Sequence, residues 1–358
     1  MIVKLKMIYI YIIYIYHSKP MSIKMEEFPI ETIYKGFFEN SVGIIEDSQG
    51  SYYIATDRIV KKLKYDLDTN SYEIYNYIDR FKEQLSSKNY ISGIIGIKIL
   101  SDKESFILYS HVDVYKVSNI IDNVENKKIE RIIRTRGSYI FSNNSLLLKD
   151  LDINRVKLLD IDENDNIYMI VELAYMPKEK CIIRVDTRNG DSKILKINIP
   201  DTHVCTSLKV IGSKIYYTII EYLINQNNMI TDRKLVIMDL EKEYLKEITE
   251  IPIKENLYMI SDVDNLCLIA TGKDNDSIYI MEYIPDTNSY IFTPYIGCQC
   301  GNKDSHLVDY PITSKNIHLH DVEQLCIDKD NNILFVEHNK LKKIVRCPPN
   351  SSVKSAIY

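Results

Sequence analysis

The feature that most constrains the fold is a short unit that recurs along most of the chain. It consists of an apolar strand, a turn rich in Asp, Asn and Gly, and further strands, and its clearest copy is Val322–Arg346. Within this copy Lys329–Asn332 is a turn whose side chains can bond the local backbone. The runs Val322–Asp328, Ile333–Glu337 and Leu341–Arg346 have the pattern of strands. One such meander is not stable alone, because both of its faces need cover. Several copies must therefore pack against one another.

The copies are regularly spaced along the chain. Six turns of this kind follow one another at a mean interval of about 56 residues, with centres near Gly50, Lys103, Asn166, Gly212, Asn265 and Asn332. Propeller blades repeat every 40–50 residues, roughly, with about four strands each. Three expected loops account for the longer interval here: Ala174–Lys180, Glu221–Asp232 and Gly297–His320. We therefore predict an all-β fold, a six-bladed β-propeller of four-stranded antiparallel blades.

Composition agrees with this fold class. The chain has 28 Tyr, no Trp and many Ile residues, and Tyr and Ile favour strands. Evidence for helix is thin and lies in Glu73–Leu85, where strand alternation holds as far as Ile78 and a short helix could follow to Ser87. The sequence therefore predicts a chain built almost entirely of strands.

A propeller must close its ring, and the last repeat lacks an obvious outer strand after Arg346. Either Ile30–Phe38 or Val353–Tyr358 can supply it. We favour Ile30–Phe38, because pairing there holds the two ends together and removes an open edge. The expected organisation is a leader over residues 1–29, the propeller over 30–346 and a tail over 347–358.

The leader begins with Met1–Tyr16, in which Lys4 and Lys6 precede an apolar run. This resembles the first two regions of a signal peptide, yet no small-residue cleavage site follows. The run is also shorter than the ~20 apolar residues that span a bilayer, so no transmembrane span is expected. A mis-called start, with translation from Met21 or Met25, a disordered leader and a targeting segment all stay open. We expect a cytoplasmic protein, with an exported or membrane-associated one as the alternative if the signal is genuine.

The net charge narrows the classes of partner, and the cysteine content indicates the redox compartment. The formal net charge is −5 and the basic runs are short, whereas a duplex nucleic-acid binder usually carries a basic patch. A nucleic-acid partner is therefore not supported. The 7 cysteines are odd in number and irregularly spaced, which fits a reducing compartment better than a disulfide framework.

The segment Tyr295–Arg346 carries a resemblance to a known family. Its matching residues are Gly301, Leu325-Cys326-Ile327-Asp328, Asp330-Asn331-Asn332, Ile333–Val336, Asn339 and Lys343-Ile344-Val345. In this order they resemble an NHL-type propeller repeat. The segment departs from that pattern at Glu337-His338, where Ala-Asp is usual. The resemblance implies a six-bladed propeller, and such propellers include both binding platforms and hydrolase or lactonase enzymes.

The most metal-like cluster is Cys298 and Cys300, followed by His306, His318 and His320. Cys and His suit tetrahedral zinc, and residues at alternate positions of a strand face the same side. However, the common second pair of closely spaced ligands is absent. We therefore predict no metal site and interpret the stretch as a polar loop between the fifth and sixth blades. Zinc held by Cys298, Cys300, His318 and His320 is the alternative.

Acidic residues gather at several turns and are possible calcium ligands: Asp160, Asp162, Glu163 and Asp165, then Asp262 and Asp264, then Asp328 and Asp330. The competing interpretation is local, because Asp in such turns accepts hydrogen bonds from the backbone that follows it. We favour the local interpretation.

The sequence contains no Gly-x-Ser-x-Gly, phosphate-loop or His-Glu-x-x-His motif. We therefore expect a monomeric, non-enzymatic binding or scaffold protein without a cofactor. It would contact another protein, or a small ligand, through loops on one face, and we favour the loops Glu221–Asp232 and Gly297–His320. The alternative is a metal-dependent hydrolase of the lactonase or esterase type, with a single divalent ion in the central channel.

Overall fold

The structure is a computed structural model that describes most of the chain from Pro29 to Val345. The described residues are 29–36, 38, 41–79, 93–121, 126–134, 153–174, 176–188, 191–200, 202–225, 228–242, 244–248, 257–261, 267–271, 278–284, 287, 289–296, 303–304, 312–313, 317–319, 322–337 and 339–345.

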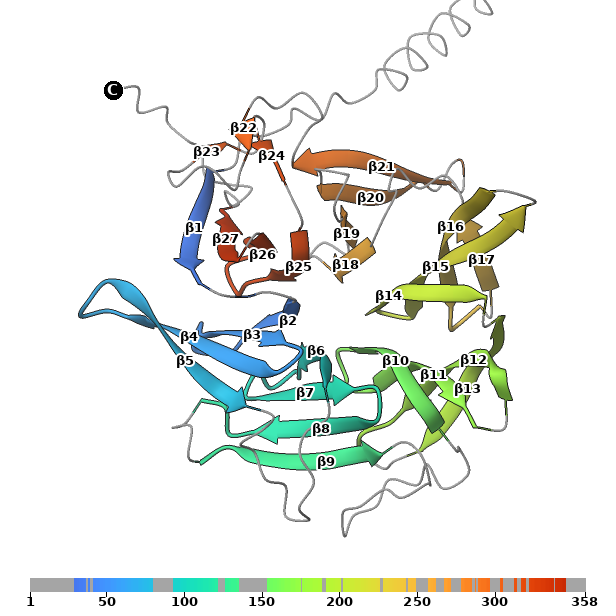
Figure 1. Cartoon of the computed structure of the whole chain (residues 1–358), viewed down its shortest axis with the longest axis horizontal. Coiled ribbons are helices and arrows are strands. Elements are labelled where there is room, and N and C mark those ends of the chain that lie inside the picture. The colour runs from blue at the N-terminus through green and yellow to red at the C-terminus, as the bar shows by residue number, and fades with distance from the viewer. Residues whose placement is uncertain are drawn as a thin grey trace, which may run out of the picture.

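Within these residues, five antiparallel sheets are each built from four consecutive strands (Figure 1). They are β2 (Ser41–Glu46), β3 (Tyr52–Thr56), β4 (Ile59–Asp66) and β5 (Ser71–Asp79); β6 (Ile94–Ile99), β7 (Ser105–Ser110), β8 (Asp113–Ser118) and β9 (Lys128–Arg134); β10 (Ile153–Ile161), β11 (Ile167–Leu173), β12 (Met176–Val185) and β13 (Ser192–Pro200); β14 (His203–Ile211), β15 (Lys214–Asn225), β16 (Asn228–Asp239) and β17 (Tyr244–Ile248); and β18 (Leu257–Ser261), β19 (Cys267–Thr271), β20 (Ile278–Ile284) and β21 (Ser289–Ile296).

A further sheet joins the two ends of the described chain. Its strand order is β23 (Ile312–Thr313), β1 (Pro29–Lys35), β27 (Lys340–Ile344), β26 (Ile333–Glu337) and β25 (Val322–Ile327). β1 runs antiparallel to β27, with Ile30 opposite Ile344 and Lys35 opposite Lys340. The pairing predicted for the Ile30–Phe38 segment is therefore confirmed, and an early strand completes a sheet made by the last ones. We call this the composite sheet.

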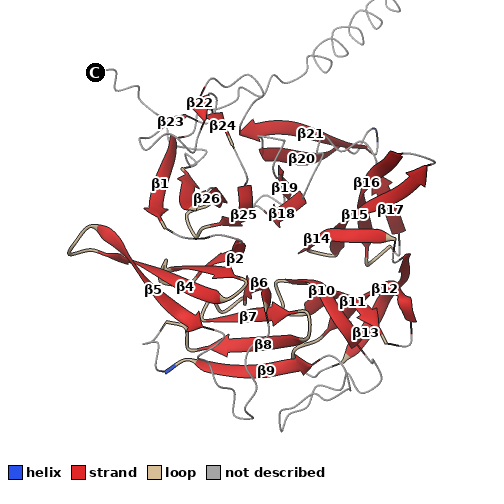
Figure 2. Ribbon diagram, in the orientation of Figure 1, coloured by secondary structure: helices blue, strands red, loops and turns tan. Residues whose placement is uncertain are grey.

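The sheets are arranged around a centre, and one edge strand of each lies innermost (Figure 2). Neighbouring inner strands are in contact, in the order β2, β6, β10, β14, β18 and β25, and β25 in turn contacts β2. The fold is thus an all-β propeller of four-stranded antiparallel blades. In the part of the chain that the structure describes, no helix has the length and apolar character needed to cross a membrane.

The turns that follow the inner strands lie at one end of the ring. Hydrogen bonds between the turns of neighbouring sheets show this. The Ser48 amide donates to the Lys103 carbonyl over 3.1 Å. The Ser101 amide and hydroxyl each donate to the Asp165 carboxylate over 2.7 Å. This end of the central channel is called the turn end below.

Local geometry explains why these turns recur. Each of five described turns has one residue with positive φ: Gly50 (82°), Lys103 (52°), Asp165 (63°), Gly212 (54°) and Asn331 (63°). All five lie within one residue of a predicted turn centre, while the sixth centre, Asn265, lies outside the described residues. Positive φ favours Gly, Asn and Asp, which is why these residue types mark the repeat in the sequence.

The acidic turn residues confirm the local interpretation in two places. The Asp162 carboxylate accepts hydrogen bonds from the amides of Asn164 and Asn166, both at 2.9 Å. Asp328 accepts equivalent bonds from the amides of Asp330 (2.9 Å) and Asn332 (2.8 Å). These carboxylates therefore stabilise their own turns.

The prediction of a loop is wrong at two places in the chain, where the structure has β-hairpins instead. The Ala174–Lys180 region belongs largely to β12, which starts at Met176. In the Glu221–Asp232 region, Glu221 is paired with Asp232 and the strands β15 and β16 continue as far as Asn225 and Asn228. In both places the ladder extends beyond the length that a typical blade led us to expect, and in the second Ile224, Ile230 and Thr231 are β-branched residues that favour strand.

Other expectations fall largely outside the described residues. Of the Gly297–His320 loop, the structure describes β22 (Lys303–Asp304), β23 and β24 (Ile317–His318), with Leu319 after it. β5 ends at Asp79, so the strand part of Glu73–Leu85 is confirmed, and the helix expected after Ile78 stays a prediction.

Adjacent sheets are held together by apolar cores and a few buried polar groups. The Tyr53 ring of the first sheet packs edge-on against Tyr77 of the same sheet, with centroids 5.2 Å apart, and against Phe106 of the second sheet, with centroids 5.6 Å apart. Lys62 is buried beside them and donates to the Ile120 carbonyl over 2.8 Å, with its ammonium 3.5 Å from the Asp47 carboxylate. Desolvation lowers the pKa of Lys62 despite the attraction of Asp47. The first two sheets are therefore fixed in position relative to each other, on one side of the channel.

Candidate ligand-binding cavity in the central channel

A cavity of about 480 Å³ occupies the described part of the central channel. It is lined by residues of the inner strands β2, β6, β10, β14 and β25. Its wall exposes polar and apolar surface in about equal amounts, and the apolar residues that line it include Ile44, Ile95, Ile97, Leu158, Leu208 and Leu325. The cavity exists because the inner strands meet around the centre and their side chains do not fill it.

Charged side chains in this wall gather toward the turn end. Glu46 is the last residue of β2, Lys98 and Asp160 are the last but one of β6 and β10, and Lys209 is the third from the end of β14. Lys103 lies in the turn that follows β6. Because these inner strands all finish at the turn end, the fold brings the five positions to a similar depth, although they are far apart in sequence.

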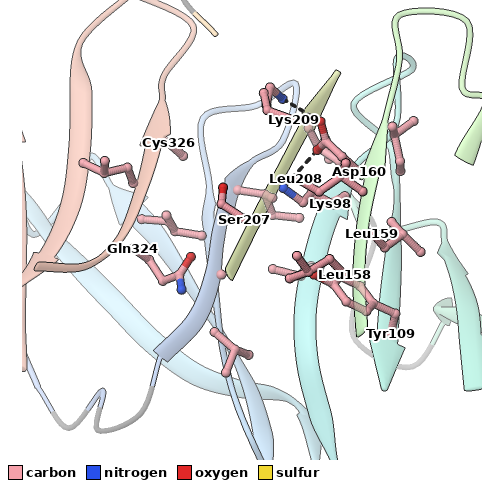
Figure 3. Close-up of a pocket in the computed structure, with 18 of the residues that line it drawn as sticks. Lys98, Tyr109, Leu158, Leu159, Asp160, Ser207, Leu208, Lys209, Gln324 and Cys326 are labelled. Atoms are coloured by element: carbon pink, nitrogen blue, oxygen red, sulfur yellow. Dashed lines mark ion pairs between the residues drawn. The ribbon is translucent and has the colours of Figure 1, made fainter. Parts of the chain in front are cut away.

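Asp160 is the centre of this arrangement (Figure 3). Its carboxylate lies 3.0 Å from the Lys98 ammonium and 3.2 Å from the Lys209 ammonium, and it accepts a hydrogen bond from the Val210 amide over 2.8 Å. Burial acts to raise the pKa of Asp160, but the charges of Lys209 and Lys98 and the Val210 amide outweigh it. The net effect is a pKa below the ordinary 3.8, so the carboxylate is charged at neutral pH.

The two lysines are more accessible than the acid that they share. The Lys98 side chain is 31% exposed and that of Lys209 is 17% exposed, whereas Asp160 is 1% exposed. Ser207 and Gln324 add polar groups farther along the wall, and Figure 3 places Gln324 away from the charged cluster. The cavity thus has a charged end and a body lined by aliphatic side chains with a few uncharged polar groups.

On the other side of the turn end, Glu46 accepts a hydrogen bond from the Lys329 amide of the composite sheet. Burial raises the pKa of Glu46, and the negative charge of Asp328 also acts to raise it. Burial likewise raises the pKa of the nearby Cys326 thiol, which is free of any disulfide. A thiol of this kind is a poor nucleophile, so Cys326 contributes bulk to the wall.

Most of the residues considered as metal ligands from the sequence lie outside the described part of the structure. Cys298, Cys300, His306 and His320 lie outside the described residues, and so does the side chain of His318, so zinc binding there is untested. Asp262 and Asp264 also lie outside them. Among the residues that are described, no group of three or more His, Cys, Asp or Glu is placed to hold a metal ion.

Asp160 corrects the interpretation of the acidic turns. The sequence grouped it with Asp162, but the structure gives its carboxylate to Lys98 and Lys209 of the neighbouring sheets. Those lysines were not singled out beforehand. The available signal was a lone cation inside an apolar strand, as in Ile97-Lys98-Ile99 and Leu208-Lys209-Val210, which is unusual unless the charge has a partner or faces a cavity.

Comparisons with known proteins find similarity in structure and none in sequence. No family model matches the sequence, so the resemblance to NHL repeats stays a prediction, and no curated protein matches it. Among solved structures, an auxiliary nutrient binding protein from Bacteroides thetaiotaomicron VPI-5482 is similar at a TM-score of 0.56 and 10% identity, over 89% of this chain and 77% of that one. At that identity the likeness concerns the fold.

Two more distant propellers show a weaker similarity. Virginiamycin B lyase from Staphylococcus aureus aligns at a TM-score of 0.49 and 14% identity, over 90% of this chain and 100% of that one. The WD40 β-propeller domain of Doa1 aligns at a TM-score of 0.48 and 8% identity, over 89% of this chain and 98% of that one.

Proposed function

We propose that this chain is a non-enzymatic, six-bladed propeller that binds a small organic ligand in its central channel. The observation that carries the proposal is the cavity of about 480 Å³ between the inner strands. Small-molecule sites are typically about 300–1,000 Å³, mostly apolar, and provided with a few polar groups that fix orientation. The volume and the pairing of aliphatic side chains with a charged end agree with this, although the wall exposes about as much polar as apolar surface. The described cavity is also built on strands rather than loops, which favours a fixed binding geometry.

The composite sheet supports the count of six blades. Its inner strand β25 contacts both β2 and β18, the inner strands of the first and fifth sheets. It therefore occupies the place that a sixth blade would fill. An end-to-end closure of this type makes the ring depend on β1, and hence on a segment close to residue 29.

A direct test asks whether filling the cavity abolishes binding. Ser207 lines the cavity and is 7% exposed, so Ser207→Phe should place a ring in the space. Ligand-observed NMR with a fragment mixture should show binding to the wild-type protein and lose it in this variant. Ser207→Leu is the smaller substitution to use if the phenylalanine variant does not fold.

Ser71→Phe, at an exposed residue at the start of β5, is the matched control and should keep binding. Fragments that bind the wild type and Ser207→Phe equally would contradict the proposal.

One observation favours a protein partner as a second candidate. β14 pairs with β15 only up to Glu221, and β17 pairs with β16 only from Leu235 onward. In the described structure, residues 222–225 and 228–231 therefore form a ribbon that extends beyond its sheet. Such ribbons are marginal in isolation, so a partner that adds a strand would stabilise this one. Protection of these amides from hydrogen exchange, measured with and without a candidate partner, tests this alternative.

The hydrolase alternative makes a separate demand, which is a tightly held divalent ion. Elemental analysis of the full chain purified without chelator tests it directly. About one equivalent of metal surviving dialysis would favour that function over the binding protein proposed here.

A further inference from the structure

The charged end of the cavity has more positive than negative charge. Two ammonium groups, Lys98 and Lys209, share the single carboxylate of Asp160. With Lys103 and Glu46 included, the described residues of this wall comprise three cations and two carboxylates, which again leaves one positive charge in excess. The acid is 1% exposed and the two lysines are 31% and 17% exposed, so a molecule in the cavity meets the cations first.

We propose that the cavity binds an oxyanion, a carboxylate or phosphate group on a small apolar body, through Lys98 and Lys209. This inference rests on the proposed function and specifies the class of ligand. Each ammonium has three N–H donors. Within the described residues, both lysines form their ion pair with Asp160. Donors therefore remain on both lysines for a ligand.

The buried acid acts as a positioning residue for the two lysines. Three donors hold its carboxylate: the two ammonium groups and the Val210 amide. Because Asp160 is fixed in this way, it keeps the ends of two long, flexible side chains close together. Ordering the site around a bridging oxyanion therefore costs less entropy than it would with free lysines. The same arrangement repels a cationic ligand.

The rest of the wall defines the other half of the ligand. Beyond the charged end the wall is formed by aliphatic side chains such as Ile95, Leu158 and Leu208. These bury apolar surface, and they also exclude water and so strengthen the interaction of the oxyanion with the lysines. A small carboxylic acid or phosphate monoester with an apolar body fits both parts, whereas inorganic phosphate alone would use only the charged end.

The test compares three probes with similar bodies: benzoate, phenyl phosphate and the neutral benzamide. Titration calorimetry on the full chain should show benzoate or phenyl phosphate binding roughly tenfold or more tightly than benzamide, as expected for hydrogen bonds to charged groups. Lys209→Gln should weaken the anions roughly tenfold and leave benzamide unchanged. Lys98→Gln is the second variant, in case Lys209→Gln does not fold. Lys64→Gln, at an exposed position of β4, makes the same charge change away from the cavity and should have no effect.

A further variant separates the charge of Asp160 from its packing. Asp160→Asn keeps an oxygen for hydrogen bonding but removes the negative charge beside the lysines, so anion binding should become several-fold tighter. Unchanged or weaker anion binding in a variant that circular dichroism shows to be folded would count against an anion held beside Asp160.

The outcomes separate this inference from the proposed function. Equal affinities for benzoate, phenyl phosphate and benzamide, all lost in Ser207→Phe, would leave a ligand-binding cavity but overturn the oxyanion site. Absence of binding by both anions, in a protein whose cavity takes up neutral fragments, would do the same. Anion binding that survives both Ser207→Phe and Lys209→Gln would place the anions elsewhere and overturn the oxyanion site. The proposed function would fall as well if neutral fragments also bind Ser207→Phe as they bind the wild type.

Discussion

Replacing Asp160 by Asn should measure how much the charged cluster stabilises the ring. Its carboxylate lies 3.0 and 3.2 Å from two ammonium groups of neighbouring sheets and is 1% exposed. Removing one partner of a buried ion pair costs about 3–5 kcal/mol. Here the lysines are partly exposed and can regain water, and Asn still offers an oxygen to the Val210 amide. We therefore expect Asp160→Asn to lower the free energy of unfolding by about 2–3 kcal/mol near neutral pH.

The direction of the pKa shift of Asp160 determines how this stability difference changes with pH. The pKa of Asp160 in the folded protein lies below its ordinary value of 3.8. A lowered carboxyl pKa stabilises the folded state above the unfolded pKa, and this stabilisation is lost as the pH falls through the folded pKa. The difference between wild type and Asp160→Asn should therefore be constant from neutral pH down to about 4 and shrink at lower pH.

The chain has no Trp, so urea unfolding is best followed by far-UV circular dichroism. Asp68→Asn is the matched control, because it makes the same change at an exposed turn residue and should stay within about 0.5 kcal/mol of wild type. A wild-type to Asp160→Asn difference that stays unchanged well below pH 4 would refute the assignment of this stability to the carboxylate charge. So would an equal loss in the control.

Three further changes test the fold. Gly43→Ala would place a Cβ 2.6 Å from Ile97 Cγ2, where β2 and β6 meet, and should cost about 1–3 kcal/mol in urea unfolding. Glu337→Ala removes the carboxylate that pairs with buried Lys342, and should cost about 3–5 kcal/mol; a loss below about 1 kcal/mol would contradict a buried charge pair. Deleting residues 1–28 should leave the melting temperature close to that of the full chain, whereas deleting residues 1–35 removes β1 and should lower it or cause aggregation; equal melting of the two would show that β1 does not close the ring.

The architecture was accessible from the sequence because its cause is local. A turn that needs positive φ favours Gly, Asn or Asp at one position, as in four of the five described turns, and Asp162 or Asp328 at its start closes the turn by accepting backbone hydrogen bonds. These residue types therefore recur with the blade and mark the period. The hairpins at Ala174–Lys180 and Glu221–Asp232 were missed, because turn residues and strand residues mix there and do not show where a ladder stops.

The candidate site was not accessible in the same way. Lys98, Asp160 and Lys209 come from three different sheets, and each has aliphatic residues on both sides in the sequence. Nothing in the linear order pairs them. The spacing of acidic residues even suggested a different role for Asp160, as a possible calcium ligand or turn former.

The sequence by itself thus determined the strand content, the repeating turns and the segment that pairs with the last strands. The strand content and the turns depend on backbone conformation and on hydrogen bonds between nearby residues, and the pairing segment was found because the last repeat lacks an outer strand of its own. Only the tertiary structure decided that the inner strands end together around one channel and that two lysines converge on one buried acid there. Coulombic and desolvation energies depend on distances through space between residues remote in sequence, so the chemistry of the channel arises only when the ring closes.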